Sequence, residues 1–336
     1  MANENLVSII IPAYNSEITL GNTLDSIKAS TYPQAEIIIV DDCSTDNTCK
    51  VAAAYDCSLI RCEKNMGIGF CRNRGAEAAR GEFLFFTDAD VCLQKDAIEL
   101  GVTTLLANAD ISAVIGSFTK HSGVSNVISR YKQLVLHHIH QTAREDTFLF
   151  VGFCSIIRKQ VFTGIGGFNQ TLFNWIGEDI DLGARLYDAG YKIFLHKKML
   201  AVHYKRYGFF DLLYNDTIKR AIPWTYFLLT HKFLKFDVCT KIEDLLSIIT
   251  VYLILAAVGL TFFQPYFGMV FFIFLILIFG LLNQSLLKLF FKINGLKFAF
   301  FSFILRLIYY FLSSIGSIAG ICFYYMKGKK KLYYSR

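Results

Sequence analysis

No two cysteines in this chain of 336 residues are spaced CxxC, although nine cysteines are present. An odd number without that spacing indicates neither a disulfide framework nor a structural zinc site, and it is typical of a reducing compartment. The N-terminal segment MANENLVSIII also lacks the basic start of a signal peptide, and its apolar run stops at Pro12. We therefore expect the residues that follow to stay in the cytoplasm.

Charged residues are missing from residues 245–263 and 265–282, and residues 298–325 contain only one, Arg306. Runs of roughly 18 or more apolar residues can cross the hydrocarbon layer as helices. Residues 245–326 are therefore predicted to be an all-α transmembrane region of a multi-pass protein in the cytoplasmic (inner) membrane. The formal charge of +7 gathers near this region and in the basic tail, which suits an anionic bilayer surface and not nucleic acid.

The topology of the third run stays open. Lysines before this run and the basic tail after it both favour the cytoplasmic side, whereas a third crossing would place the tail outside. Either this rule is broken, or residues 298–325 lie partly in the interface. In that case Arg306 would reach toward the surface, and a bend would be allowed by Ser313, Ser314 and Gly316.

The first part of the chain alternates between short apolar strands and helical patterns. Strands are predicted at residues 6–11, 36–40, 58–62, 82–87 and 111–116, and helices at 17–30, 47–55, 69–79 and 95–107. This alternation predicts an α/β, Rossmann-like fold with a mostly parallel sheet covered by helices. Ligands bind such sheets at the carboxyl ends of the strands, so the candidate site residues are those that follow each strand.

Asp88 and Asp90 follow the fourth strand. If the chain stays extended there, side chains two apart point to the same side, and two adjacent carboxylates need a positive partner. The third strand is followed by Asn65, Gly67 and a helix that carries Arg72, a combination that suits a diphosphate. A lone DxD is more often a solvated turn or a helix cap. Its place in this alternating unit favours Mg²⁺ or Mn²⁺, held between the aspartates and a nucleotide's phosphates.

The segments VSIIIPAYN, IIIVDDCSTDNT, NMGIGFCRNRGAEAARGEFLFFTDADV and WIGEDIDLGARL resemble the successive motifs of family 2 glycosyltransferases, which are inverting enzymes of the GT-A fold. The resemblance covers residues 6–207 and depends on the order and spacing of the motifs. It implies a metal site at Asp88, Asp90 and His203, and a catalytic base at Asp179 with Glu178 beside it. It also implies a nucleotide-sugar site, to which we assign Pro12, Ala13, Tyr14, Asn15, Asp41, Asp42, Asn65, Gly67, Arg72 and Asp88.

Plainer interpretations exist for several of these residues. Glu178 and Asp179 would also suit a helix start, where the helix dipole favours carboxylates, and Asp181 can pair with Arg185 one turn away. His203 is one of seven histidines, and a lone histidine is usually a packed or solvated side chain. The cluster HHIH lies in an amphipathic run and is more typical of a helix face than of a zinc site; its histidines are His137, His138 and His140.

We therefore expect a catalytic domain over residues 1–207, an interfacial amphipathic segment over 208–244, the transmembrane region over 245–326 and the basic tail over 327–336. The expected function is the transfer of one sugar from a nucleotide-sugar to a hydroxyl of a glycolipid or lipid-linked saccharide, as part of cell-envelope synthesis. The expected donor is a UDP-sugar. The QxxRW pattern of processive relatives is absent, which favours single transfer. The alternatives are a polyprenyl-phosphate glycosyltransferase and a non-catalytic membrane scaffold that binds nucleotide-sugar.

Overall fold

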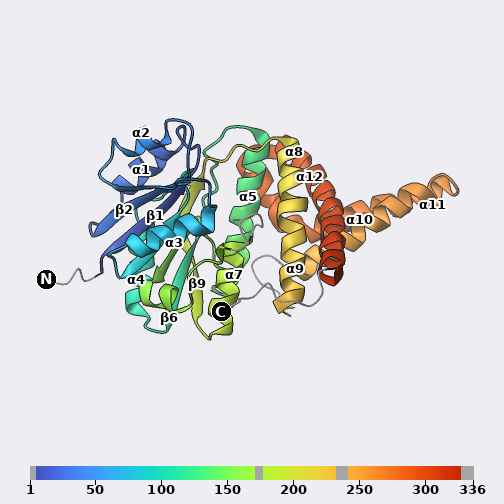
Figure 1. Ribbon diagram of the computed structural model, residues 1–336. Coiled ribbons are helices and arrows are strands. Elements are labelled where there is room, and N and C mark those ends of the chain that lie inside the picture. The colour runs from blue at the N-terminus through green and yellow to red at the C-terminus, as the bar shows by residue number, and fades with distance from the viewer. Residues whose placement is uncertain (1–4, 171–176, 232–240, 327–336) are drawn as a thin grey trace. The chain divides into compact units, whose positions relative to one another are not determined.

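The computed structural model describes residues 5–170, 177–231 and 241–326. The chain divides into two compact units, of which the first comprises residues 1–125 and 139–206 and the second comprises residues 126–138 and 207–336. Figure 1 identifies the elements of each unit. The second unit thus includes thirteen residues that lie within the span we assigned to the catalytic domain, namely residues 126–138.

The first unit contains all the strands and most of the shorter helices. In chain order these are β1 (Val7–Ala13), α1 (Leu20–Lys28), β2 (Ala35–Asp41), α2 (Thr48–Ala52), β3 (Ser58–Arg61), α3 (Ile68–Ala78), β4 (Phe83–Thr87), β5 (Val91–Leu93), α4 (Ala97–Ala107), β6 (Ile111–Phe118), β7 (Asp146–Thr147), β8 (Cys154–Arg158), α6 (Lys159–Gly164), α7 (Glu178–Asp188) and β9 (Lys192–His203). Helix α5 (Val127–Thr142) begins in the second unit and ends in the first.

The strands form one nine-stranded sheet in the order β3-β2-β1-β4-β8-β6-β9-β5, with β7 beside β9. Strands β3, β2, β1 and β4 are parallel to one another, and so are β6 and β9. Helices α3 and α4 pack against these two groups of strands (Figure 1). The predicted α/β fold is confirmed. The departures from a purely parallel sheet are β8, which lies antiparallel between β4 and β6, and the short strands β5 and β7, which are both antiparallel to β9.

The register of the parallel strands determines which residues meet at the carboxyl edge. Ala13 at the end of β1 lies opposite Asp41 at the end of β2, and Asp41 lies opposite Arg61 at the end of β3. Helix α3 approaches β1 closely because residue 75 is glycine: a Cβ there would lie 2.5 Å from Ile10 Cγ2. The sheet therefore fixes both the strand ends and the helix that follows β3.

The second unit is helical in its described residues. It contains α8 (Phe209–Asp216), a π-helical turn (Thr217–Ala221), α9 (Ile222–His231), α10 (Ile242–Leu260), α11 (Pro265–Leu282) and α12 (Gln284–Met326). Helices α10, α11 and α12 are long and apolar enough to cross a membrane, and the two charge-free runs predict α10 and α11. Residues 327–336, the predicted basic tail, lie outside the described residues, as do residues 232–240 of the predicted interfacial segment.

The bend that the sequence allowed near Ser313 and Ser314 is not where α12 departs from helical geometry. That departure is at Gly295, whose φ of 79° lies in the left-handed region that glycine adopts most readily. Gly316 has a packing role instead, because a Cβ there would lie 2.7 Å from the carbonyl oxygen of Thr217. Small residues of this kind allow the backbones of apolar helices to approach closely.

Arg306, which the sequence analysis considered as a residue reaching toward the membrane surface, has polar partners inside the second unit. Its side chain is buried within the second unit, where Nε lies 3.3 Å from the side-chain oxygen of Asn283 and an Nη donates to the Tyr310 hydroxyl. The Tyr310 hydroxyl in turn donates to Asp244 at 2.7 Å, and Arg306 lies 3.6 Å from the same carboxylate. Polar side chains of the second unit thus supply hydrogen-bond acceptors for the Arg306 guanidinium, as is usual for charged residues within apolar helices.

Candidate active site

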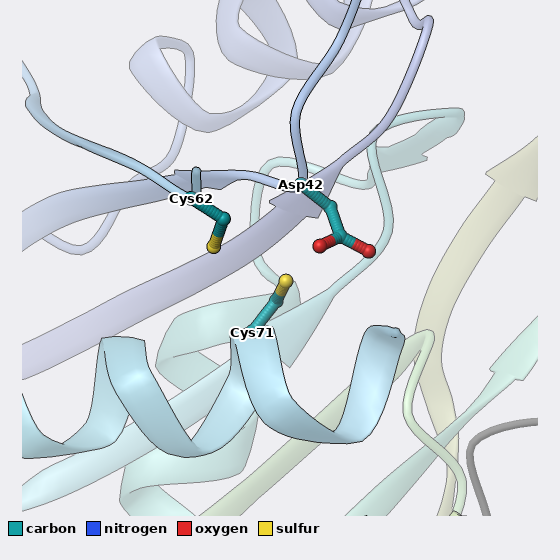
Figure 2. Close-up of side chains that lie close together, drawn as sticks. All are labelled: Asp42, Cys62 and Cys71. Atoms are coloured by element: carbon teal, nitrogen blue, oxygen red, sulfur yellow. The ribbon is translucent and has the colours of Figure 1, made fainter. Parts of the chain in front are cut away.

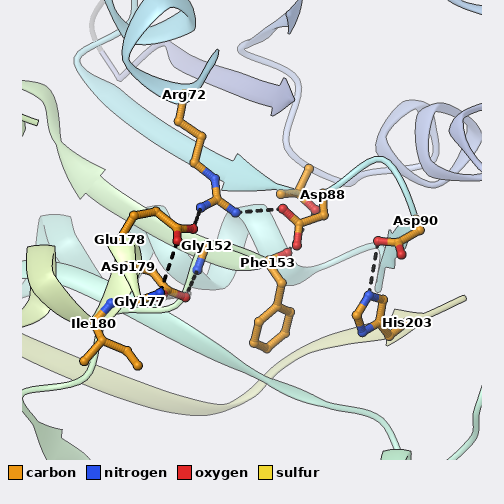
Figure 3. Close-up of polar contacts among 11 residues, drawn as sticks. Arg72, Asp88, Asp90, Gly152, Phe153, Gly177, Glu178, Asp179, Ile180 and His203 are labelled. Carbon is orange, nitrogen blue, oxygen red and sulfur yellow. Dashed lines mark hydrogen bonds and ion pairs between the residues drawn. The ribbon is translucent and has the colours of Figure 1, made fainter. Parts of the chain in front are cut away.

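Asp88 and Asp90 lie where β4 leaves the buried part of the sheet. Our assumption that the chain stays extended there was wrong: the Val91 N–H bonds to the Asp88 carbonyl at 3.1 Å, so residues 88–91 form a turn. The two carboxylates consequently contact different partners, Arg72 for Asp88 and His203 for Asp90 (Figure 3).

His203 reaches Asp90 because it is the last residue of β9, which pairs with β5 so that Val91 lies opposite His203. The imidazole Nε2 lies 3.1 Å from Asp90 Oδ1. Burial alone would raise the pKa of Asp90, but the hydrogen bond and charge of His203 outweigh it and hold that pKa below its usual value. The structure thus brings together two of the three residues assigned to the metal.

Arg72 connects the two acidic motifs of the site. On the second turn of α3 and only 2% exposed, it donates from Nη2 to Asp88 Oδ1 and from Nη1 to Glu178 Oε1, both at 2.8 Å. Figure 3 shows its guanidinium between the two carboxylates. The contact that we expected between Arg72 and a diphosphate stays a prediction. In this structure the arginine is the internal counter-ion of the site.

Gly152 makes room for this arginine, a role that sequence reasoning missed. A Cβ at residue 152 would overlap the guanidinium of Arg72. The Gly152 N–H also points toward Asp179 Oδ2, at 3.4 Å. The signal in the sequence is the single glycine in FVGFC, just before β8, but only the fold shows that an arginine distant in sequence lies against it.

Asp179 lies at the start of α7, beside Glu178. Its Oδ1 accepts the N–H of Ile180 at 2.8 Å. Burial, followed by the neighbouring charge of Glu178, raises the pKa of Asp179 to about 7, although Arg72 opposes the shift. A carboxyl group with such a pKa can take up a proton near neutral pH, which is what a general base requires.

The remaining charged residues of α7 stabilise the helix. Arg185 Nε donates to Asp181 Oδ2 at 2.8 Å, which confirms the pairing that the sequence predicts. The other two nitrogens of this guanidinium donate to the carbonyl oxygens of Ile165 and Gly167. Asp181 therefore orients Arg185, which in turn binds the segment at residues 165–167. The site carboxylates of this motif are Glu178 and Asp179.

Asp42 and the turn after β3 meet at the edge assigned to the nucleotide. Asp42 Oδ1 accepts the N–H of Met66 at 2.7 Å, and Oδ2 accepts the N–H of Gly67 at 2.9 Å. The Asn65 side chain donates to the Asp42 carbonyl oxygen at 3.4 Å. The carboxylate thereby shapes the turn that starts α3, where Gly67 adopts a φ of 88°.

The residues at the end of β1 lie beside the same edge. Asn15 Oδ1 accepts the N–H of Thr45 at 2.9 Å, which ties the PAYN segment to the loop after β2. Pro12 and Ala13 are buried in the sheet, and Tyr14 is 52% exposed. The structure brings the segments at residues 12–15, 41–42 and 65–67 together, and the exposed ring of Tyr14 belongs to the first of them.

Asp41 is completely buried at this edge. Its Oδ2 accepts the N–H of Ser44 at 3.2 Å, and Arg61 lies 3.8 Å from the same oxygen. Its Oδ1 is buried and has no hydrogen-bond partner among the described residues. A buried carboxylate oxygen without a donor is costly, so this position favours the approach of a further N–H or O–H group.

The HHIH cluster lies inside α5, as expected for a helix face. His140 is buried there, with Nδ1 3.1 Å from the carbonyl oxygen of Gly116. His137 is also buried.

A divalent cation fits the Asp88, Asp90 and His203 group on chemical grounds. Burial and the neighbouring charge of Asp90 raise the pKa of Asp88, against the opposing charge of Arg72. Burial thus disfavours the ionised form of Asp88, and a cation beside the two carboxylates would offset that cost. Carboxylate oxygens and an imidazole nitrogen are ligands that Mn²⁺ and Mg²⁺ accept.

Comparison with known families agrees with this geometry. Residues 8–166 match the model of glycosyl transferase family 2. These residues form a family 2 glycosyltransferase domain. Residues 137–208 of the same chain match the model described as the N-terminal domain of galactosyltransferase. The two matches together cover the segments that supply Arg72, Asp88, Asp90, Asp179 and His203 to the site.

Curated proteins that resemble this domain are named as glycosyltransferases. It is 36% identical over 99 residues to the putative teichuronic acid biosynthesis glycosyltransferase TuaG of Bacillus subtilis, covering 28% of this chain and 39% of that protein. It is 32% identical over 119 residues to the Escherichia coli UDP-Glc:alpha-D-GlcNAc-diphosphoundecaprenol beta-1,3-glucosyltransferase WfgD, covering 34% and 47%. Matches to the curated relatives cover between 15% and 66% of the length of each relative.

A solved structure resembles the chain over most of its length. The mannosyltransferase PcManGT of Pyrobaculum calidifontis, in complex with GDP-Man and Mn²⁺, superposes with a TM-score of 0.55. The match covers 93% of this chain and 86% of that one, at 17% identity. At this identity the likeness concerns the fold: the family 2 glycosyltransferase domain has a GT-A sheet and is followed by apolar helices.

Proposed function

We propose that this protein is a membrane-anchored inverting glycosyltransferase that moves one sugar from a nucleoside-diphosphate sugar, with UDP as the expected nucleotide, to a hydroxyl of a lipid-linked saccharide. The observation that carries the proposal is Asp179, a partly buried carboxylate with a pKa raised to about 7 at the edge where β4 ends. A hydroxyl acceptor needs such a base, because its own proton leaves only far above neutral pH.

Each group of the site has a separate task in this proposal. The residues at 12–15 and 65–67, with Asp41 and Asp42, hold the nucleotide. Asp88, Asp90 and His203 would hold Mn²⁺ or Mg²⁺, which when bound neutralises the charge that develops on the departing diphosphate. Asp179 takes the proton of the acceptor hydroxyl, while Arg72 keeps Glu178 and Asp88 in place beside it.

Membrane anchoring is supported by the three long apolar helices α10, α11 and α12. We propose that they place the chain in the cytoplasmic membrane with the catalytic unit in the cytoplasm. The lipid-linked acceptor is suggested by the name of the relative WfgD, whose acceptor is a diphosphoundecaprenol-linked sugar. The bilayer would then bring enzyme and acceptor together in two dimensions.

The Asp179→Asn variant tests the base. It preserves the size of the side chain but cannot accept a proton, so kcat should fall by about 10²-fold or more, while nucleotide-sugar binding changes little. Purified protein would be assayed with labelled nucleotide-sugars and lipid-linked acceptors. A wild-type rate from Asp179→Asn would favour a polyprenyl phosphate acceptor, which is already an anion at neutral pH. No transfer by the wild type with any donor would favour a non-catalytic scaffold.

Removal of the cation tests the metal assignment separately. EDTA should abolish transfer by the wild type, and excess Mn²⁺ or Mg²⁺ should restore it, because an uncoordinated diphosphate is a poor leaving group. Asp90→Asn should require more cation for half-maximal activity, since it removes a charged ligand. Full activity in EDTA would contradict the assignment of Asp88, Asp90 and His203.

A further inference from the structure

Two thiols that the proposed reaction does not use lie beside Asp42 (Figure 2). Cys62 directly follows β3, and Cys71 lies in the first part of α3, on the turn that also carries Arg72. One ligand atom each of Asp42, Cys62 and Cys71, a carboxylate oxygen and two sulfurs, lies within 4.8 Å of the other two. The cysteines are nine positions apart, so a search for CxxC does not detect them.

We propose that Asp42, Cys62 and Cys71 form a site for a soft divalent cation, with Zn²⁺ as the expected ion. Zn²⁺ binds thiolate sulfur at about 2.3 Å and carboxylate oxygen at about 2.0 Å in a tetrahedral arrangement, so ligand atoms about 3.5–3.8 Å apart are needed. The present spacing of up to 4.8 Å must therefore shorten by about 1 Å when the ion binds. Two sulfur ligands distinguish this site from the oxygen-rich group at Asp88 and Asp90, which suits harder cations.

Backbone hydrogen bonds hold the Asp42 carboxylate in a fixed orientation. Asp42 accepts N–H groups from Met66 and Gly67, one on each oxygen, and each oxygen retains a lone pair for a cation. Hydrogen bonds of this kind fix the orientation of metal-binding carboxylates. The Cys62 N–H donates to the Asp41 carbonyl oxygen at 2.8 Å, so the backbone that carries this thiol is fixed as well.

A dication at this site must replace the protons of both thiols. Burial raises the pKa of both thiols, and for Cys71 the charge of Asp42 adds to that shift. The thiols are therefore protonated at neutral pH, and binding releases both protons to solvent as the sulfurs become thiolates. Cys71 and Asp42 are buried whereas Cys62 is partly exposed, so an ion would enter beside Cys62 and keep its fourth position open to water.

Cadmium titration of the full-length protein in detergent tests this site without any sugar transfer. Cd²⁺ bound to thiolate absorbs in the ultraviolet, and we expect one such ion per chain at this site, displaced by Zn²⁺. Cys62→Ser and Cys71→Ala should each weaken the affinity for Cd²⁺ by at least about tenfold. Cys57→Ser is the matched control, because Cys57 is also partly exposed and lies in the same unit outside the cluster.

Thermal unfolding gives an independent measurement, because an ion that binds only the folded protein raises Tm. Zn²⁺ should raise the Tm of the wild type and of Cys57→Ser but not that of Cys62→Ser. Equal Cd²⁺ affinities for the wild type and Cys62→Ser would overturn the proposal. So would a wild type whose two thiols are joined in a disulfide under the reducing conditions of the titration. Either result leaves the glycosyltransferase reaction untouched, because neither readout depends on it.

Discussion

Arg72 in the first unit and Arg306 in the second are both buried, at 2% and 6% exposure, but they are satisfied in different ways. Arg72 forms two ion pairs at 2.8 Å, with Asp88 and Glu178. Arg306 contacts neutral oxygens of Asn283 and Tyr310, and its nearest carboxylate, Asp244, lies 3.6 Å away.

The difference shows what each arginine contributes. Arg72 compensates two carboxylates that would otherwise repel one another and Asp179, so removing it leaves several buried charges uncompensated. Arg306 completes a hydrogen-bonded group whose other members also contact each other, because the Tyr310 hydroxyl donates to Asp244. The first arginine determines the electrostatics of a reactive site, and the second holds apolar helices together.

The largest effect is expected from Arg72→Met, which keeps an unbranched apolar side chain and removes the charged guanidinium. Removing one partner of a buried ion pair costs about 3–5 kcal/mol, because the other partner is left buried and unpaired. The free energy of unfolding of the first unit should fall by that amount, measured by urea unfolding in detergent.

Arg74→Met is the matched control, two positions further along α3. Its ion pair with Glu77 is exposed on both sides, and such pairs contribute about 0–1 kcal/mol. If Arg72→Met and Arg74→Met unfolded at the same urea concentration, the view of Arg72 as the internal counter-ion would be wrong.

A smaller effect is expected from Gly152→Ala, which leaves every charge in place. The added Cβ would overlap the guanidinium, so Arg72 must move away from the sheet, and overpacking of this kind costs about 1–3 kcal/mol. The variant should also turn over more slowly, since the movement displaces Glu178 beside Asp179. Gly164→Ala is the control because no atom lies within 4 Å of a Cβ there, and it should leave stability and rate nearly unchanged.

Arg306→Met should cost less than either change in the first unit. The contacts between Tyr310, Asn283 and Asp244 remain, and side-chain hydrogen bonds between membrane helices contribute about 0.6 kcal/mol on average. Thermal unfolding in lipid or detergent should show a small decrease in Tm. A loss as large as that of Arg72→Met would mean that the Arg306 group is an ion-pair network like that of the site.

The fold was predictable because its signals are local. The alternation of apolar strands with helices predicts the α/β unit, and the charge-free runs predict α10 and α11 to within a few residues. The antiparallel placement of β8 was not predictable, since the sequence contains a strand pattern there but nothing that determines its direction. The bend at Gly295 was missed because a glycine inside a helical pattern does not reveal its φ.

The site was predictable as a set of residues but not as a set of contacts. Motif order leads to Asp88, Asp90, Asp179 and His203, which the structure places along one edge of the sheet. Burial, however, depends on tertiary packing. Sequence reasoning therefore did not predict the ion pairs of Arg72 with Asp88 and Glu178, and the need for glycine at residue 152 went unnoticed.

The pH dependence of kcat follows from the raised pKa of Asp179. The base works only when deprotonated, so kcat should rise as pH increases through about 7 and level off above it. Below that pH each further unit should lower the rate by about tenfold, since one proton blocks the base. A profile that stays flat from about pH 5 to about pH 8 would contradict Asp179 as the base.

The smallest expected change is a shift of this profile in Glu178→Gln. The negative charge of Glu178 raises the pKa of Asp179, and its removal also leaves one side of the Arg72 guanidinium without a carboxylate. Both consequences favour the ionised form of Asp179, so the acid side of the kcat profile should move to lower pH by up to about one unit. Glu77→Gln, exposed on α3, should leave the profile in place. A shift to higher pH would mean that Glu178 does not act on Asp179 through its charge, and that Arg72 does not transmit the charge of one acidic motif to the other.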